Sequence, residues 1–202
     1  DTNSSALLSI TPIGELAFLE QYIEDDYENI VREIIKNDNG YLLAGWSRTY
    51  SPELQMFIYI IQTDVEGNKL GSTILSPDDF RCGAYTGFRT SDGGFMIGGF
   101  VIPYLSSPFF HEPYIVKLDA FGQVQWSRIY DNYVANNWVE DMLPSEDGGA
   151  YLLLQTNYYV GGSDMALLRV DSLGNIVWEK NYDFNPYSAI PDATDQHDSP
   201  RS

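Results

Sequence analysis

The chain has 202 residues, with 29 acidic and 11 basic side chains, and its formal net charge is −18. This length suits one domain or two small ones, and the 14% of aromatic residues excludes a disordered acidic tail. Because the negative field repels phosphates and no run of 18 apolar residues occurs, we expect neither a nucleic-acid partner nor a membrane-spanning segment.

The N-terminal segment Asp1–Ser5 is short and polar, and it lacks the initiating Met and the apolar core of a signal peptide. We therefore interpret it as a mature or trimmed start. Half of a repeat unit follows at 6–22, because Leu7–Gly14 matches the later segment Leu167–Gly174. Thr11 stands in this half unit where the later segment has Asp171.

Three full units follow, near 23–74, 75–130 and 131–182. Each contains a glycine turn that leads into an apolar strand: Asp38–Gly45, Asp92–Gly99 and Asp147–Leu154. Each then contains a second turn of the form Asp-x-x-Gly. The residues of these structural turns are Asp64 and Gly67, Asp119 and Gly122, and Asp171 and Gly174. Together with Gly14, the three glycines of these turns mark one recurring register.

Each unit contains four strand-like runs, which in the middle unit lie near 81–90, 94–101, 113–118 and 123–130. Four short antiparallel strands that recur in each unit are typical of a β-propeller blade. We therefore predict an all-β, β-propeller-like array of four-stranded antiparallel blades, with about three full blades and a partial one, over residues 1–182.

Residues 183–202 cover the place of a first strand and stop where a second would begin. Prolines 186, 191 and 200 make this stretch a poor strand, so we predict a polar C-terminal tail or a partial strand. The array is then open, end-capped, completed by another chain, or a fragment of a larger ring.

The segments Asp92–Gly99, Tyr114–Trp126 and Ala166–Trp178 resemble the β-propeller-like repeats of bacterial secreted and cell-surface proteins. The units of that family read approximately D-G-G-Y-x-x-x-G and then Y-L-x-K-L-D-x-x-G-N-x-x-W, and kelch repeats are similar. The resemblance implies a propeller fold and an exported setting, periplasmic or at the cell surface, with a lipid anchor before trimming as one option. It implies no shared catalytic residues.

The first full unit departs from the family pattern, because Gly71 stands at the tryptophan position. We expect looser packing there. Trp126 and Trp178, which occupy that position in the later units, are expected to pack between blades. The turn aspartates could bind calcium, but their spacing favours capping of their own turns.

The loops between the second and third strands differ from unit to unit, and such loops often bind partners. They are rich in aromatic residues, which could form one surface on one face of a propeller. Arg48 and His111 lie near them. The alternative is that these rings cover blade edges. The candidate binding residues are Trp46, Tyr50, Tyr104, Phe109, Phe110, Tyr158 and Tyr159.

Acidic groups cluster at the start of the first strand of each unit: Glu24–Asp26 with Glu28, Asp78 with Asp79, and Glu140 with Asp141. Paired carboxylates could hydrolyse glycosides if they converged, whereas a solvated acidic rim needs no convergence. Nucleophilic chemistry has little support, because the only histidines are His111 and His197 and no elbow or metal motif occurs. The single cysteine, Cys82, reads as a packed strand residue.

The leading hypothesis is therefore a non-enzymatic, exported binding or scaffolding module without metal or cofactor. It would engage a protein, peptide or glycan through the aromatic loops. The alternatives are a carbohydrate-active enzyme with paired carboxylates and a structural segment of a larger adhesin-like propeller.

Overall fold

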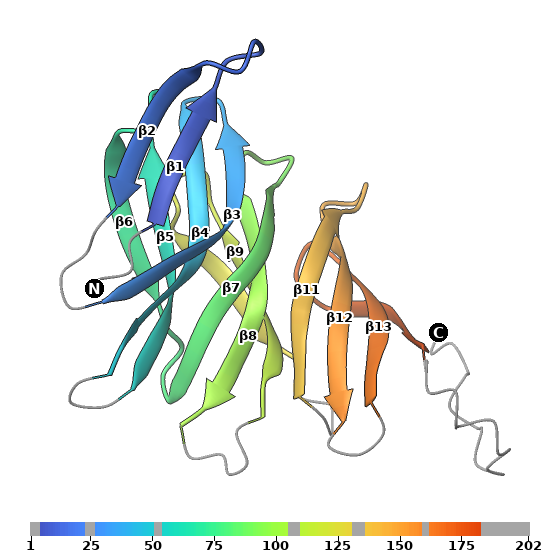
Figure 1. Cartoon of the computed structure of the whole chain (residues 1–202). Helices are drawn as coiled ribbons and strands as arrows, with labels where there is room; N and C mark the ends of the chain where they lie inside the picture. Colours follow the sequence, from blue (N-terminus) through green and yellow to red (C-terminus); the bar gives the residue numbers. More distant parts are fainter. Residues whose placement is uncertain are drawn as a thin grey trace, which may run out of the picture.

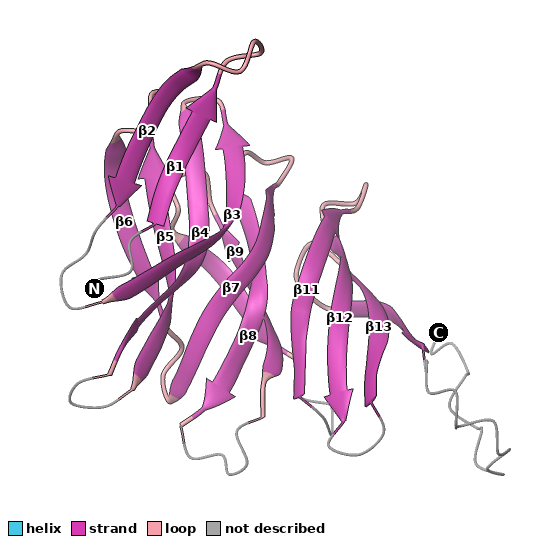
Figure 2. Cartoon of the chain, in the orientation of Figure 1, coloured by secondary structure: helices cyan, strands magenta, loops and turns pink. Residues whose placement is uncertain are grey.

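The computed structural model describes residues 5–22, 27–50, 54–104, 110–130, 136–158 and 162–182. These residues form an all-β structure of four antiparallel sheets, as Figures 1 and 2 show. No helix in these ranges is long and apolar enough to cross a lipid bilayer.

The strands follow the chain in simple meanders, in which each strand pairs with the next one. A two-stranded sheet, the N-terminal hairpin, is followed by the first, second and third four-stranded sheets. The hairpin contains β1 (Ser5–Ile10) and β2 (Leu16–Tyr22). The first sheet contains β3 (Glu28–Asn37), β4 (Gly40–Thr49), β5 (Gln55–Thr63) and β6 (Lys69–Leu75). The second contains β7 (Phe80–Arg89), β8 (Phe95–Pro103), β9 (Glu112–Leu118) and β10 (Val124–Ile129), and the third contains β11 (Asn136–Pro144), β12 (Ala150–Tyr158), β13 (Gly162–Val170) and β14 (Ile176–Tyr182).

The N-terminal hairpin has the same register as the last two strands of each four-stranded sheet. Ile10 pairs with Leu16 as Leu118 pairs with Val124, and both pairs follow a register shift at the same place. The backbone φ of the turn glycine is 85° at Gly14 and 78° at Gly122, and residues other than glycine rarely adopt such values. The hairpin is therefore the second half of a four-stranded unit in its geometry as well as its sequence.

The four-stranded sheets stack face to face, with their first strands side by side. β3, β7 and β11 are edge strands of their sheets, and β7 contacts both β3 and β11. β7 also packs on β4 and β5, and β11 packs on β8 and β9. Three apolar cores fill the three interfaces, one for each pair of successive sheets. The described residues do not close these sheets into a ring (Figure 1).

An aromatic lock joins successive sheets at the Asp-x-x-Gly turns. A Cβ on Gly174 would lie 2.8 Å from Trp126 Cζ3, and the Tyr130 hydroxyl donates to the Gly174 carbonyl at 2.9 Å. Burial raises the pKa of the Tyr130 hydroxyl well above its usual value, so that this group stays a donor. Phe18 and Tyr22 hold Gly67 in the same way, and the Tyr22 hydroxyl donates to its carbonyl at 2.7 Å.

The lock is missing between the first and second four-stranded sheets. A Cβ on Gly71 would meet no atom within 4 Å, and the flexible end of Gln62 lies over Gly122 instead. Gln62, Leu70 and Phe121 line a cavity of about 290 Å³ between these sheets. The looser packing expected from Gly71 is thus present, because the flexible end of Gln62 does not fill the space of the absent aromatic ring.

Candidate functional site

The candidate loop residues lie in several different settings. Trp46 belongs to β4, so its assignment to a loop is wrong, because β4 continues to Thr49. Tyr50 directly follows β4 and Tyr104 directly follows β8. Phe110 precedes β9. Phe109 and Tyr159 lie outside the described residues, as does the side chain of Tyr158 at the end of β12.

Tyr50 and Tyr104 each stack on an arginine of their own sheet. The Arg48 Cζ lies 5.2 Å from the ring centre of Tyr50, and the Arg81 Cζ lies 5.7 Å from that of Tyr104. Arg48 also forms an ion pair with Glu28. Arginine–tyrosine stacks therefore mark the same end of two neighbouring sheets, and both tyrosines are exposed there.

The turn aspartates accept hydrogen bonds from their own turns. Asp64 Oδ1 accepts the amide hydrogens of Glu66 at 3.0 Å and Asn68 at 2.8 Å. The side-chain amide of Asn68 also lowers the pKa of Asp64. Asp171 accepts the corresponding bonds from Leu173 and Asn175, both at 2.9 Å.

Asp119 makes two such bonds, from the amides of Phe121 and Gln123 at 2.8 Å each. In the hairpin the Thr11 hydroxyl accepts from the Glu15 amide at 3.1 Å. All four turns thus have a capping side-chain oxygen at the same position. Across the described ranges, His, Cys, Asp and Glu form no group of three or more that could hold a metal.

The acidic groups of the first strands have separate local partners. Glu28 pairs with Arg48, Glu140 accepts from Trp138 Nε1 at 2.7 Å, and Asp141 accepts from the Thr86 hydroxyl at 3.2 Å. Glu24–Asp26 lie outside the described residues. Glu28, Glu140 and Asp141 are therefore engaged by three different side chains.

Cys82 is buried in β7 and its thiol donates to the Leu75 carbonyl at 3.2 Å. Burial raises the pKa of this thiol to about 11, which keeps it protonated and unreactive at neutral pH. Cys82 is therefore a packing residue.

Five aromatic rings and an arginine form the longest series of ring contacts in the described structure, on the side-by-side first strands and the segments next to them. We call it the inner-edge cluster. Its members, in order across the three sheets, are Arg32, Trp46, Tyr85, Phe100, His111 and Trp138.

The rings make edge-on and tilted contacts in a continuous series. The centroid distances are 5.6 Å from Trp46 to Tyr85, 5.2 Å from Tyr85 to Phe100 and 4.9 Å from Phe100 to His111. The series ends with His111 and Trp138 at 5.9 Å. Contacts of this kind stabilise a rigid arrangement of rings, because they match the positive edge of one ring to the negative face of the next.

Charged groups lie on both sides of Tyr85. The Arg32 guanidinium lies 5.2 Å from its ring centre and 5.6 Å from that of Trp46. Burial raises the pKa of the Tyr85 hydroxyl, Arg32 opposes that rise, and Glu140 adds to it. Arg32 and Glu140 are exposed, whereas the rings of Trp46, Tyr85 and Trp138 are half-buried. The cluster therefore has a cation stacked on two of its rings and an anion hydrogen-bonded to a third.

The cluster contains two polar groups, the indole N–H of Trp46 and the imidazole of His111. The indole N–H of Trp46 is buried without a hydrogen-bond partner among the described residues. His111 is held by Asn136, whose side-chain oxygen accepts from the His111 amide at 3.0 Å. Burial lowers the pKa of the His111 imidazole, which keeps the ring neutral at physiological pH. The cluster thus encloses an unpaired indole donor among fixed, uncharged rings.

The sequence patterns did not identify Arg32, Tyr85 and Trp138 as site residues. Arg32, Tyr85 and Glu140 each occupy the extra residue of a β-bulge in the first strand of their sheet. A bulge redirects a side chain, and its exact residue is visible only in the pairing register. The aromatic character of Tyr85 and Trp138 was the only available signal.

Neither a protein-family model nor a curated protein matches this chain.

Proposed function

We propose that the chain is a non-enzymatic binding or scaffolding module of an exported protein, which engages a protein, peptide or glycan through the inner-edge cluster. The sheets are consecutive blades of a β-propeller-like array in this proposal. Its exported setting rests on the resemblance of the repeat units to those of bacterial surface proteins.

The stacking of the sheets supports the propeller-like arrangement. Each four-stranded sheet is a meander whose first strand packs beside the first strand of the next sheet. First strands that line a common axis are the geometry of blades in a propeller. The open array accounts for the hairpin as half a blade.

The observation that carries the binding proposal is the continuous ring series from Trp46 to Trp138, which draws on all three four-stranded sheets. Half-buried aromatic rings on a rigid scaffold stack on sugar faces and anchor peptide side chains at low entropic cost. The exposed side chains of Arg32 and Glu140, which contact rings of the cluster, add groups for polar contacts. Such a series of aromatic side chains is not needed for the backbone pairing of the strands.

Binding of soluble oligosaccharides and of an immobilised peptide library tests the proposal. Trp138→Ala and Arg32→Ala should each weaken the binding of any captured probe about tenfold or more, because central aromatic and arginine anchors dominate such sites. Phe121→Ala is the matched control, since Phe121 is an exposed aromatic residue on a distant turn. Its affinity should stay within about twofold of the native value.

Tyr50→Ala and Tyr104→Ala test the original expectation that the loops bind. A loss of affinity in these two variants, with Trp138→Ala unaffected, would move the site to the arginine–tyrosine stacks. The inner-edge proposal fails if Trp138→Ala and Phe121→Ala bind every captured probe equally well.

A further inference from the structure

The hairpin exposes a sheet face that is covered in every other unit. We call the side of each sheet that points to the preceding sheet its leading face. On the third strand of the unit, Ile61, Val116 and Leu168 occupy this face and are at most 1% exposed. Leu8 holds the same register position in β1 and is 58% exposed.

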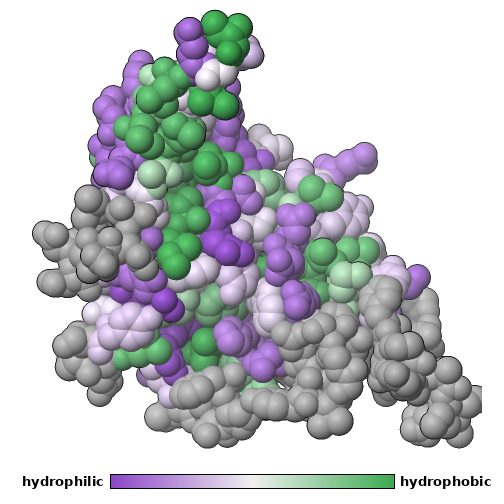
Figure 3. Space-filling view, viewed as in Figure 1, coloured by the Kyte–Doolittle hydropathy of each residue, from purple (hydrophilic) through white to green (hydrophobic). Residues whose placement is uncertain are grey.

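Other apolar residues extend this uncovered leading face. Ile10, Leu16 and Leu19 are all more than half exposed and pair across β1 and β2 with each other or with Leu8. Figure 3 shows the apolar side chains that gather over these two strands. Large contiguous apolar faces on proteins mark interaction surfaces.

The third four-stranded sheet exposes the opposite kind of face. The trailing face of a sheet points to the following sheet, and Tyr22 and Tyr130 on this face are 4% and 6% exposed. Tyr182 holds the same position in β14 and is 38% exposed. Tyr151 and Met165, also on the trailing face, are exposed to the same degree. The two ends of the array are thus unlike halves of one interface.

The components of the aromatic lock are divided between these two ends. Trp178 and Tyr182 correspond to Trp126 and Tyr130, but no described turn lies against them. Gly14 corresponds to Gly174, and a Cβ on Gly14 would meet no atom within 4 Å. Lys180, on the trailing side, and Glu15, beside Gly14, add opposite charges at positions that would meet. The N-terminal hairpin thus has the turn of an aromatic lock without its rings, and the third four-stranded sheet has the rings without a turn.

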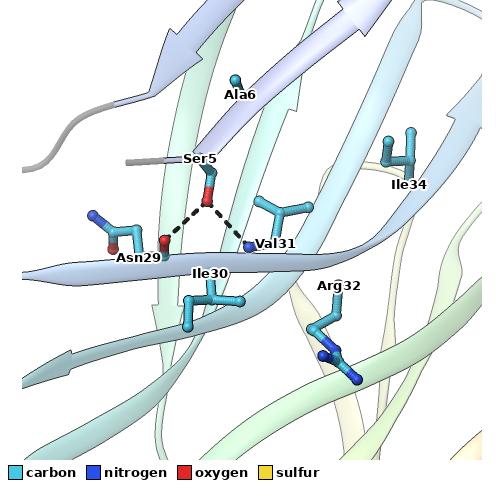
Figure 4. Close-up of a pocket in the computed structure, with 7 residues that line it drawn as sticks. All are labelled: Ser5, Ala6, Asn29, Ile30, Val31, Arg32 and Ile34. Carbon is cyan, nitrogen blue, oxygen red and sulfur yellow. Dashed lines mark hydrogen bonds between the residues drawn. The ribbon is translucent and has the colours of Figure 1, made fainter. Parts of the chain in front are cut away.

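A groove beside β1 marks the place of the strands that the hairpin lacks. This cavity of about 430 Å³ lies between β1 and β3 (Figure 4). At its wall the Ser5 hydroxyl donates a hydrogen bond to the Asn29 carbonyl and accepts one from the Val31 amide. Ile34 on its wall is 50% exposed, whereas Met142 at the same position of β11 is 4% exposed. In the complete units the preceding sheet covers this position.

We propose that two copies of this chain associate head to tail, with the trailing face of the third four-stranded sheet of one copy on the leading face of the N-terminal hairpin of the other. Gly14 then takes the place of Gly174 under Trp178 and Tyr182.

A second copy fits better than the same chain, because the two faces lie at opposite ends of the array (Figure 1). The hairpin already packs on the first four-stranded sheet through Leu7 and Tyr22. A head-to-tail interface leaves one free face at each end, so it produces rings or longer chains. This inference is independent of the inner-edge cluster.

The mass of the full chain in solution, followed by light scattering over a concentration series, tests the proposal. The native chain should exceed the mass of one copy and grow with concentration. Leu8→Lys on the leading face and Tyr182→Lys on the trailing face should each return it to one copy. Leu173→Lys is the matched control, since Leu173 is equally exposed but lies on a turn outside both faces, and it should assemble like the native chain.

A mixture of Leu8→Lys and Tyr182→Lys gives the decisive result. The first variant keeps an intact trailing face and the second an intact leading face, so an equal mixture should form a complex of two chains and no larger species. Circular dichroism shows whether both variants are folded, and Ile10→Lys and Trp178→Lys replace any that is not. A native chain that stays a single copy, or a mixture that stays single copies, overturns the proposal.

Discussion

The two interfaces between four-stranded sheets follow one plan but are filled differently. Between the second and third sheets, Trp126 and Tyr130 close over the turn at Gly174. Between the first and second sheets, Gly71 leaves this position empty and a cavity of about 290 Å³ remains. Both interfaces nevertheless have a continuous apolar core.

The difference shows that the cores align the sheets and the aromatic lock adds to that alignment. An ion pair between Arg89 and Asp38, at 2.5 Å, joins the two sheets that lack the lock. Both residues are exposed or half-exposed, so this pair contributes little stability. We therefore expect the interface without the lock to be the weaker one.

Removal of the ring from the complete lock should have the largest effect. Trp126→Ala should lower the free energy of unfolding by about 3 kcal/mol, because a packed indole is lost and the turn at Gly174 is uncovered. Trp178→Ala is the matched control at the same position of the last sheet, and it should cost less than about 1 kcal/mol in dilute solution. Urea titration measures both values, and equal losses would show that Trp126 does not act through the following sheet.

Alanine at the turn glycines should have a smaller, graded effect. Gly174→Ala and Gly14→Ala carry the same backbone penalty of about 1 kcal/mol, because both residues have a positive φ. Only Gly174→Ala also forces a Cβ against Trp126, which should add about 1 kcal/mol. Thermal unfolding of both variants measures the difference. Equal destabilisation would show that Trp126 moves aside at no cost.

A new aromatic ring at the incomplete lock should have the smallest effect on the free energy of unfolding, and it should raise it. Gly71→Trp should raise the free energy of unfolding by about 1 kcal/mol, since open space surrounds a Cβ at this position and glycine weakens a strand. Gly71→Ala separates the gain in the strand from the gain in packing. A stability of Gly71→Trp no greater than that of Gly71→Ala, by urea titration, would show that the ring does not enter the gap.

The strand order, the turns and the equivalence of the hairpin to half a unit could be predicted from local patterns. A glycine at a positive φ and an aspartate that caps its own turn determine the backbone of only a few residues. Each recurrence of this pair in the sequence therefore predicts another turn between two antiparallel strands. The placement of Trp46 could not be predicted in this way. β4 continues to Thr49 because it pairs with β5 along its whole length, which depends on a neighbouring strand.

The sequence by itself determined an all-β chain, its turn residues and the missing ring at Gly71, because each depends on short-range backbone geometry or on one recurring position. Only the tertiary structure decided which side chains meet across sheets. The ring series from Trp46 to Trp138 depends on the bulge that redirects Tyr85 and on first strands that lie side by side. The exposure of Leu8 and Tyr182 likewise became evident only when equivalent positions could be compared for burial, since burial is a property of the neighbouring sheet.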